Sequence, residues 1–272
     1  MSGDRIRGAV AGLAVGDAAG WPASRHRAAL HAPWSRRLHR ELDAFAEEHR
    51  VTTLPVPFAL NQPVAPLAVG PSDDAEWLAW TLLTADRPRA AAFRELIGRD
   101  LRARISVRTA LDNLDKGVEP PASGHDNPHH FDDAAAVRAV AFGVLGRDPD
   151  EDAQVTNAGD GVLGARAMAA AVAAAVATGD VEAAVSAALE RLPEDTAIGH
   201  NARRALAAAR RAGEAFAAVP ALDAALLDHV YSYGVGAAQT VPAALALAAA
   251  AGGARAVPAA ACLARWPTRP PR

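Results

Sequence analysis

Residues Gly161–Thr178 read GVLGARAMAAAVAAAVAT, and this stretch decides the fold class. Alanine is the strongest helix former, and a long run of small apolar residues predicts a buried helix. Alanine makes up about a quarter of the whole chain, far above ordinary usage, whereas aromatic residues make up only 5%. The scarcity of Tyr, Phe and Ile argues against sheets. We therefore predict an all-α fold whose core consists of closely packed helices rich in small residues.

Composition also narrows the class of protein. The length of 272 residues suits one compact multi-helix domain covering 1–272. A net charge of −3 offers no basic patch for nucleic acid, and Cys262, the only cysteine, excludes disulfides and thiolate clusters. The longest apolar runs, Met168–Thr178 and Val241–Ala251, are shorter than the about 20 residues that span a bilayer. We predict a cytoplasmic protein with no nucleic acid and no membrane as partner, and no pattern indicates its oligomeric state.

Two irregular stretches interrupt the helical pattern. Residues 51–70 contain four prolines, and residues 116–130 are dense in Gly, Pro, Asp, Asn and His. Long loops within a compact domain are often functional, so we expect the site where these loops lead into helices. The helices are predicted at Asp4–Ala19, Glu41–His49, Ser72–Ala85, Arg89–Asp100, Ile105–Leu114, Asp132–Leu145, Glu151–Thr156, Gly161–Thr178, Val181–Arg191, Ile198–Ala217 and Ala238–Ala251.

Ser72-Asp73-Asp74 begins one of these helices and opens the densest acidic cluster of the chain. A hydroxyl and two adjacent carboxylates are hard oxygen ligands of the kind that Mg²⁺ or Mn²⁺ prefers. The alternative is a helix cap, because Ser72 or Asp73 is a good N-cap and Asp73 with Glu76 imitates a capping box. The two interpretations are compatible, since ligands at a helix start can also cap it.

Asp17 stands in Gly16-Asp17-Ala18-Ala19-Gly20, where the first helix is expected to end. A glycine C-cap after an ordinary buried helix explains the glycines. A carboxylate near a helix C-terminus is unfavourable against the macrodipole, so Asp17 is expected to have a specific partner.

Polar residues also gather in two later segments. The loop Gly124–Asp133 holds three histidines and Asn127, and it leads into a helix that carries Arg138. Its spacing matches no zinc motif, so it is either a helix-capping loop or a substrate loop that presents Asp133, with Arg138 anchoring it. The segment Asp152–Gly161, which includes Asn157, reads by itself as a turn between two helices.

Taken in order, these segments resemble the ADP-ribosylglycohydrolase family, which includes the dinitrogenase-reductase-activating glycohydrolase and crystallin-like members. Asn157 stands where a Val-Thr-His segment of the family has histidine, and Ala75 replaces the last threonine of a Ser/Thr-Asp-Asp-Thr signature. The matching segments are Gly16–Gly20, Ser72–Asp74, Asp133–Arg138, Val155–Thr156 and Gln239–Ala246.

The resemblance implies an all-α fold with two Mg²⁺ or Mn²⁺ ions between helices. It implies hydrolysis of the glycosidic bond between ADP-ribose and a protein side chain or a related small acceptor, so the expected partner is an ADP-ribosylated protein or a small ADP-ribosyl compound. On this basis the metal ligands are Ser72, Asp73 and Asp74, and no catalytic residue is assigned. The candidate substrate-binding residues are Asp17, Asn127, Asp133, Arg138 and Asn157.

The chain also departs from the family pattern. A Gly-Asp-x-Asp-Thr motif that supplies the other half of the metal site is absent, and no side-chain carboxylate follows Asp228. Ser24 stands where many members carry glutamate. We therefore expect a C-terminally truncated member that lacks the last family helices. Three hypotheses follow: an impaired metal-dependent hydrolase, a non-catalytic ADP-ribose-binding protein, or a helical scaffold without a ligand.

Overall fold

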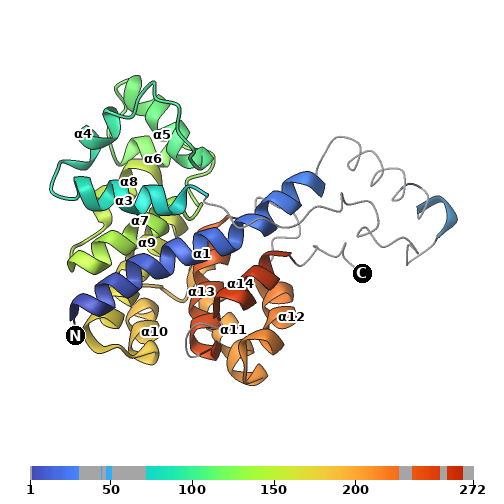
Figure 1. The fold of residues 1–272 in the computed structure, drawn as a ribbon. Coiled ribbons are helices and arrows are strands. Elements are labelled where there is room, and N and C mark those ends of the chain that lie inside the picture. Colours follow the sequence, from blue (N-terminus) through green and yellow to red (C-terminus); the bar gives the residue numbers. More distant parts are fainter. Residues whose placement is uncertain are drawn as a thin grey trace.

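A computed structural model describes residues 2–30, 44, 47–50, 72–226, 235–251 and 256–265. These residues form a set of packed α-helices (Figure 1). An isolated bridge between Asp132 and Gly236 is the extent of β-structure in this part of the chain. The predicted all-α fold is confirmed.

The first helix is longer than predicted. Helix α1 (Ser2–Leu30) passes through Gly16–Gly20 without a break, so the expected glycine C-cap is wrong. It crosses the molecule from the N-terminus and packs against α3 (Asp74–Thr84) and α14 (Ala256–Arg265) (Figure 1). Asp17 therefore lies in mid-helix, where it is buried against α3.

A group of short helices surrounds an aromatic cluster on one side of the molecule. Trp80 meets the edge of Phe93 with ring centroids 4.8 Å apart, and Trp77 stacks on Phe93 at 6.3 Å. These rings hold together segments that are too short to be stable helices alone. The short helices are α4 (Arg89–Arg94), α5 (Ile105–Asp115), α6 (Ala122–His125) and α8 (Asp150–Thr156).

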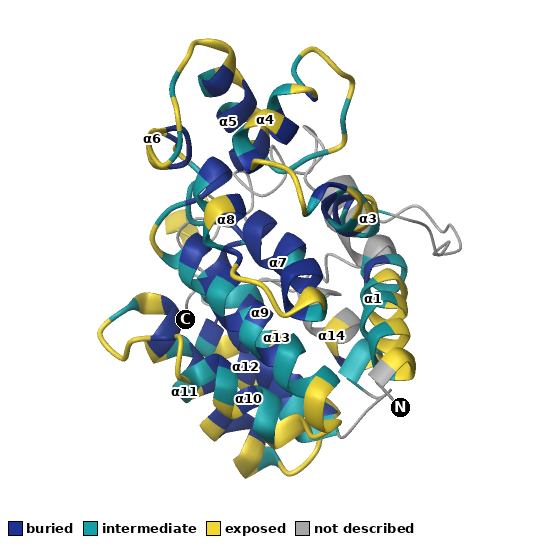
Figure 2. Cartoon of the chain, turned by 90° about the vertical axis from the view of Figure 1, so that its left-hand side faces the viewer, coloured by how far each residue is buried: buried dark blue, intermediate teal, exposed yellow. Residues whose placement is uncertain are grey.

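Helices α7 (Ala134–Leu145) and α9 (Asp160–Thr178) form the centre of the fold. Small side chains let them approach closely: a Cβ placed on Gly143 would lie 2.6 Å from the Ala169 carbonyl oxygen. Figure 2 shows α7 buried along most of its length. By length and composition α9 could cross a membrane, yet it packs between α7 and α10 (Val181–Leu189), with much of one face buried.

The C-terminal helices pack around α11 (Ala197–Ala212). The single helix predicted over Ile198–Ala217 is wrong, because Gly213 ends α11 with a positive φ of 76° and α12 (Ala215–Leu226) then begins. Helix α13 (Ala237–Ala251) agrees with the prediction within one residue, whereas α14 was not predicted.

Several predictions lie outside the described residues. They concern most of the helix at 41–49, the proline-rich loop at 51–70 and the tail after Arg265. The side chains of Ser24 and Cys262 are likewise outside the description. The single-domain interpretation stays a prediction.

The close packing of α7 on α9 predicts that position 143 tolerates no side chain larger than that of glycine without a loss of stability. We expect Gly143→Ala to lower the free energy of unfolding by about 1 to 3 kcal/mol, because the new methyl group meets the backbone of α9. The matched control is Gly12→Ala in α1, where a Cβ meets nothing within 4 Å. That control should raise stability by about 0.5 to 1 kcal/mol through helix propensity alone. Urea denaturation of both variants tests this, and equal effects would contradict the packing.

Candidate active site

Three carboxylates converge on one arginine where two helices begin. Asp73 and Asp74 stand at the start of α3, and Asp133 stands at the start of α7. The guanidinium of Arg104 contacts one oxygen of each: Nη1 to Asp73, Nη2 to Asp74 and Nε to Asp133, each at 3.0 Å. We call these four residues the acidic cluster. Each carboxylate contacts a different nitrogen, so the guanidinium fork links all three.

Hydrogen bonds hold the residues on both sides of Arg104. On one side, the indole Nε1 of Trp77 donates to the Arg102 carbonyl at 3.0 Å. On the other side, Ser106 Oγ donates to Asp132 Oδ1 at 2.7 Å. Arg104 itself is the N-cap residue of α5, and its carbonyl accepts from Arg108 N at 3.2 Å. The position of the guanidinium therefore follows from the fold of residues 102–106.

Asp17 supplies the cap of α3 from the neighbouring helix. Its two carboxylate oxygens accept from Ser72 N at 3.2 Å and from Ala75 N at 3.3 Å. Asp73, the N-cap residue by position, makes no side-chain cap hydrogen bond, so the capping-box interpretation is wrong. The reason is that its carboxylate is engaged by Arg104. The expected specific partner of Asp17 is therefore a helix N-terminus, where a negative charge is favourable.

Burial and like charges shift the protonation of the acidic cluster. Burial raises the pKa of Asp74 to about 7, although the Arg104 guanidinium lowers it, and the nearby carboxylates add to the rise. Burial also raises the pKa of Asp133. For Arg104, burial lowers the pKa, but the three carboxylates more than compensate and hold it above its ordinary value. Arg104 is therefore charged, and Asp74 exchanges its proton near neutral pH.

A second buried ion network lies beside the acidic cluster. Arg138 Nε donates to Asp152 Oδ2 at 2.7 Å, and Arg89 Nε donates to Asp152 Oδ1 at 2.9 Å. The Arg138 guanidinium also lies 5.0 Å from the Phe93 ring centroid, within the range of cation–π attraction. Arg138 is fully buried, and its hydrogen bonds to Asp152 and Thr156 lie inside the protein. Its assignment to substrate binding stays a prediction.

One nitrogen of Arg138 has no hydrogen-bond partner among the described residues, and the Arg138 side chain lines a cavity beside the acidic cluster. Nη1 is buried and has no hydrogen-bond partner among the described residues. Arg138 lines a small cavity of about 10 Å³ together with Asp73, Asp74 and Arg104. That volume matches a single water molecule. Two guanidinium groups thus face the same small space as the carboxylates.

The predicted residues Asn127 and Asn157 belong to the scaffold behind the site. Asn127 Nδ2 donates to the carbonyls of Ser106 and Thr156 at 2.7 and 3.1 Å. Asn157 Nδ2 donates to Asp132 Oδ1 and to the Asp132 carbonyl, both at 3.0 Å. Both amides are buried and occupied by these bonds, so they position the loop before α7.

The structure therefore divides the predicted site residues into two groups. Ser72, Asp73, Asp74, Asp17 and Asp133 come together at the start of α3, and their assignment as metal ligands or substrate-binding residues stays a prediction. Sequence reasoning missed Arg104, Asp152 and Thr240, whose side chain hydrogen-bonds Asp133 from α13. Within the described ranges, no group of three or more His, Cys, Asp or Glu side chains is arranged to hold a metal ion.

Removal of the Asp17 carboxylate should weaken the start of α3. We expect Asp17→Ala to lower the free energy of unfolding by about 1 to 2 kcal/mol, because two backbone N–H groups lose their acceptor. Asp4→Ala, an exposed acid on the same helix, is the matched control and should cost less than about 0.5 kcal/mol. Thermal or urea unfolding measures both, and a loss equal to that of the control would show that Asp17 does not cap α3.

The raised pKa of Asp74 predicts a pH-dependent stability. Since this pKa rises from 3.8 to about 7 on folding, the folded chain binds the extra proton, and stability falls as pH increases between these values. Full ionisation costs about 4 kcal/mol, at about 1.4 kcal/mol per pH unit between 3.8 and about 7. Asp74→Asn should therefore gain stability relative to the wild type between about pH 4 and about pH 8. Urea denaturation across this range tests the slope, and a constant difference would refute it.

Comparison with known proteins adds one finding. A family model described as ADP-ribosylglycohydrolase matches residues 2–265. No curated protein and no solved structure matches the chain.

Proposed function

Because the chain belongs to the ADP-ribosylglycohydrolase family, we propose that it binds ADP-ribosyl groups and hydrolyses the glycosidic bond that joins ADP-ribose to a protein side chain or a related small acceptor. The observation that carries this proposal is the convergence of Asp73, Asp74 and Asp133 on one point at the starts of α3 and α7. Family membership supports the class of reaction, and the acidic cluster supports the proposed location of the site.

The charge of the cluster suits the chemistry. When the bond to C1 of the ribose breaks, positive charge develops on the sugar ring, and preorganised negative groups lower the energy of that state. Three carboxylates face one guanidinium, so the acidic cluster keeps negative charge that can stabilise a positively charged sugar ring.

Asp74 is the carboxylate best placed to exchange a proton with a substrate or water. Its side chain is 26% exposed, against 12% for Asp73 and 10% for Asp133. A pKa of about 7 lets it give or take a proton at neutral pH. We assign it as the general acid or base, Asp73 and Asp133 as stabilisers of positive charge, and Asp17 as the residue that positions α3.

The oxygen donors at the start of α3 suit the expected Mg²⁺ or Mn²⁺ pair, but the position of Arg104 among them does not. Ser72, Asp73 and Asp74 offer the hard oxygen atoms that these ions prefer. Arg104, however, already engages one oxygen of Asp73 and of Asp74, and Mg²⁺ needs its ligand oxygens at about 2.1 Å in octahedral geometry. No step of the proposed mechanism is therefore routed through a metal ion, and the metal pair stays a prediction.

A non-catalytic ADP-ribose-binding protein is the second candidate, and the same arginine favours it. A guanidinium that occupies three carboxylates reduces their freedom to act on a substrate. The third hypothesis, a scaffold without a ligand, predicts no response to ADP-ribose. A cytoplasmic location and the absence of nucleic acid and membrane partners also stay predictions.

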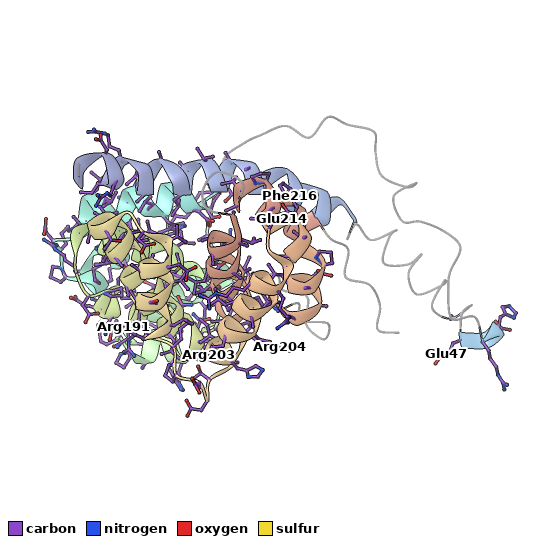
Figure 3. All side chains as sticks on the ribbon, turned by 90° about the horizontal axis from the view of Figure 1, so that it is seen from below. Glu47, Arg191, Arg203, Arg204, Glu214 and Phe216 are labelled. Carbon is purple, nitrogen blue, oxygen red and sulfur yellow. The ribbon has the colours of Figure 1, made fainter. Side chains whose placement is uncertain are left out.

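Release of free ADP-ribose from a defined ADP-ribosylated peptide, followed by liquid chromatography and mass spectrometry, tests the proposal. We expect release by the wild type, and a loss of at least about 100-fold in Asp74→Asn, because a positioned acid or base contributes that order of rate. Arg204→Ala, an exposed residue on α11 (Figure 3), is the control and should retain full activity.

Calorimetric titration with ADP-ribose separates the alternatives. Binding without release by the wild type would replace the hydrolase proposal with the binding-protein candidate. Neither binding nor release would reject both and leave the scaffold hypothesis.

A further inference from the structure

The acidic cluster already contains a cation. We propose that Arg104 is the permanent positive charge of this cluster, in the place where a divalent metal ion would sit, and that it closes the described site to Mg²⁺ and Mn²⁺. This inference concerns what neutralises the carboxylates, so it does not depend on which bond the protein hydrolyses.

The geometry of the guanidinium supports this assignment. Its Nη1, Nη2 and Nε atoms each lie 3.0 Å from a carboxylate oxygen of a different aspartate. A cation that binds three acids from two helix starts performs the same linking role as a metal ion. A metal ion would need those same oxygens much closer, at about 2.1 Å, and the guanidinium would have to leave first.

Arg104 is also held in place by its surroundings. Its side chain is 19% exposed, and the neighbouring residues Arg102 and Ser106 are tied to Trp77 and Asp132. A flexible surface arginine contributes little to stability and moves aside at little cost. Here a shift of the backbone would break the hydrogen bonds of Arg102 and Ser106, and expulsion of the side chain would separate its charge from the three carboxylates.

The guanidinium of Arg138 is a second, independent reason to expect no metal ion beside these carboxylates. Arg138 Nη1 is buried, lacks a hydrogen-bond partner among the described residues, and belongs to a side chain that lines the one-water cavity beside Asp73 and Asp74. A divalent cation in that cavity would face Arg104 and Arg138 at short range in a poorly solvated space, where like charges repel strongly. The space beside the carboxylates therefore suits a water molecule rather than a metal ion.

Mn²⁺ titration of the purified full chain, followed by the electron paramagnetic resonance signal of free Mn²⁺, tests the proposal directly. We expect no saturable binding by the wild type up to about 1 mM. We expect Arg104→Ala to bind Mn²⁺ at least about tenfold more tightly, because three carboxylates lose their cation. In the same variant, saturating Mn²⁺ should raise Tm by about 5 °C, with a negligible shift in the wild type.

Two controls keep the result interpretable. Arg204→Ala makes the same change on the exposed face of α11 and should bind no Mn²⁺. Arg104→Gln removes the charge but keeps a hydrogen-bond donor, so it provides a folded comparison if the alanine variant does not fold, and it should also gain Mn²⁺ binding. Saturable Mn²⁺ binding by the wild type that is lost in Asp73→Asn would overturn the proposal. So would a folded Arg104→Gln variant that gains no binding.

Discussion

Carboxylates that are removed from water need positive charge or hydrogen-bond donors close to them, and this constraint shapes the centre of the molecule. Arg104 meets it for Asp73, Asp74 and Asp133, while Arg138 and Arg89 meet it for Asp152. The two networks touch at the cavity that Arg138 shares with Arg104. Removal of Arg104 or of Asp152 would leave buried charges without their partner, and this costs far more free energy than the ion pairs contribute.

The fold serves these networks by bringing helix starts together. Helices α3 and α7 begin at the acidic cluster, and their N-terminal N–H groups favour negative charge there. Helix α1 adds the Asp17 cap, and the buried Asn127 and Asn157 hold the loop that leads to α7. The alanine-rich helices lie behind these helix starts, and α13 adds the Thr240 side chain, which hydrogen-bonds Asp133. Together these helices form a closely packed support that holds the N-termini of α3 and α7 in place.

Local patterns predicted the fold class and much of the site, while partners distant in sequence could not be predicted. Helix propensity is a local property, so alanine content indicated an all-α fold before any contact was known. Asp17 was expected to have a specific partner, but for the wrong reason, since α1 continues past Gly20. Arg104 was missed because it reads as one more arginine in a chain with 28 Lys and Arg residues. Its importance arises from Asp133, which lies 29 residues further along the chain.

Our proposal that Arg104, and not a metal ion, balances these carboxylates depends on where the Arg104 side chain lies. A crystal structure at high resolution, determined in the presence of Mn²⁺ with anomalous diffraction data, tests it most directly. We expect density for the Arg104 side chain between Asp73, Asp74 and Asp133, with no anomalous peak beside them. An Mn²⁺ peak bound to Ser72, Asp73 and Asp74, with Arg104 turned away, would contradict it.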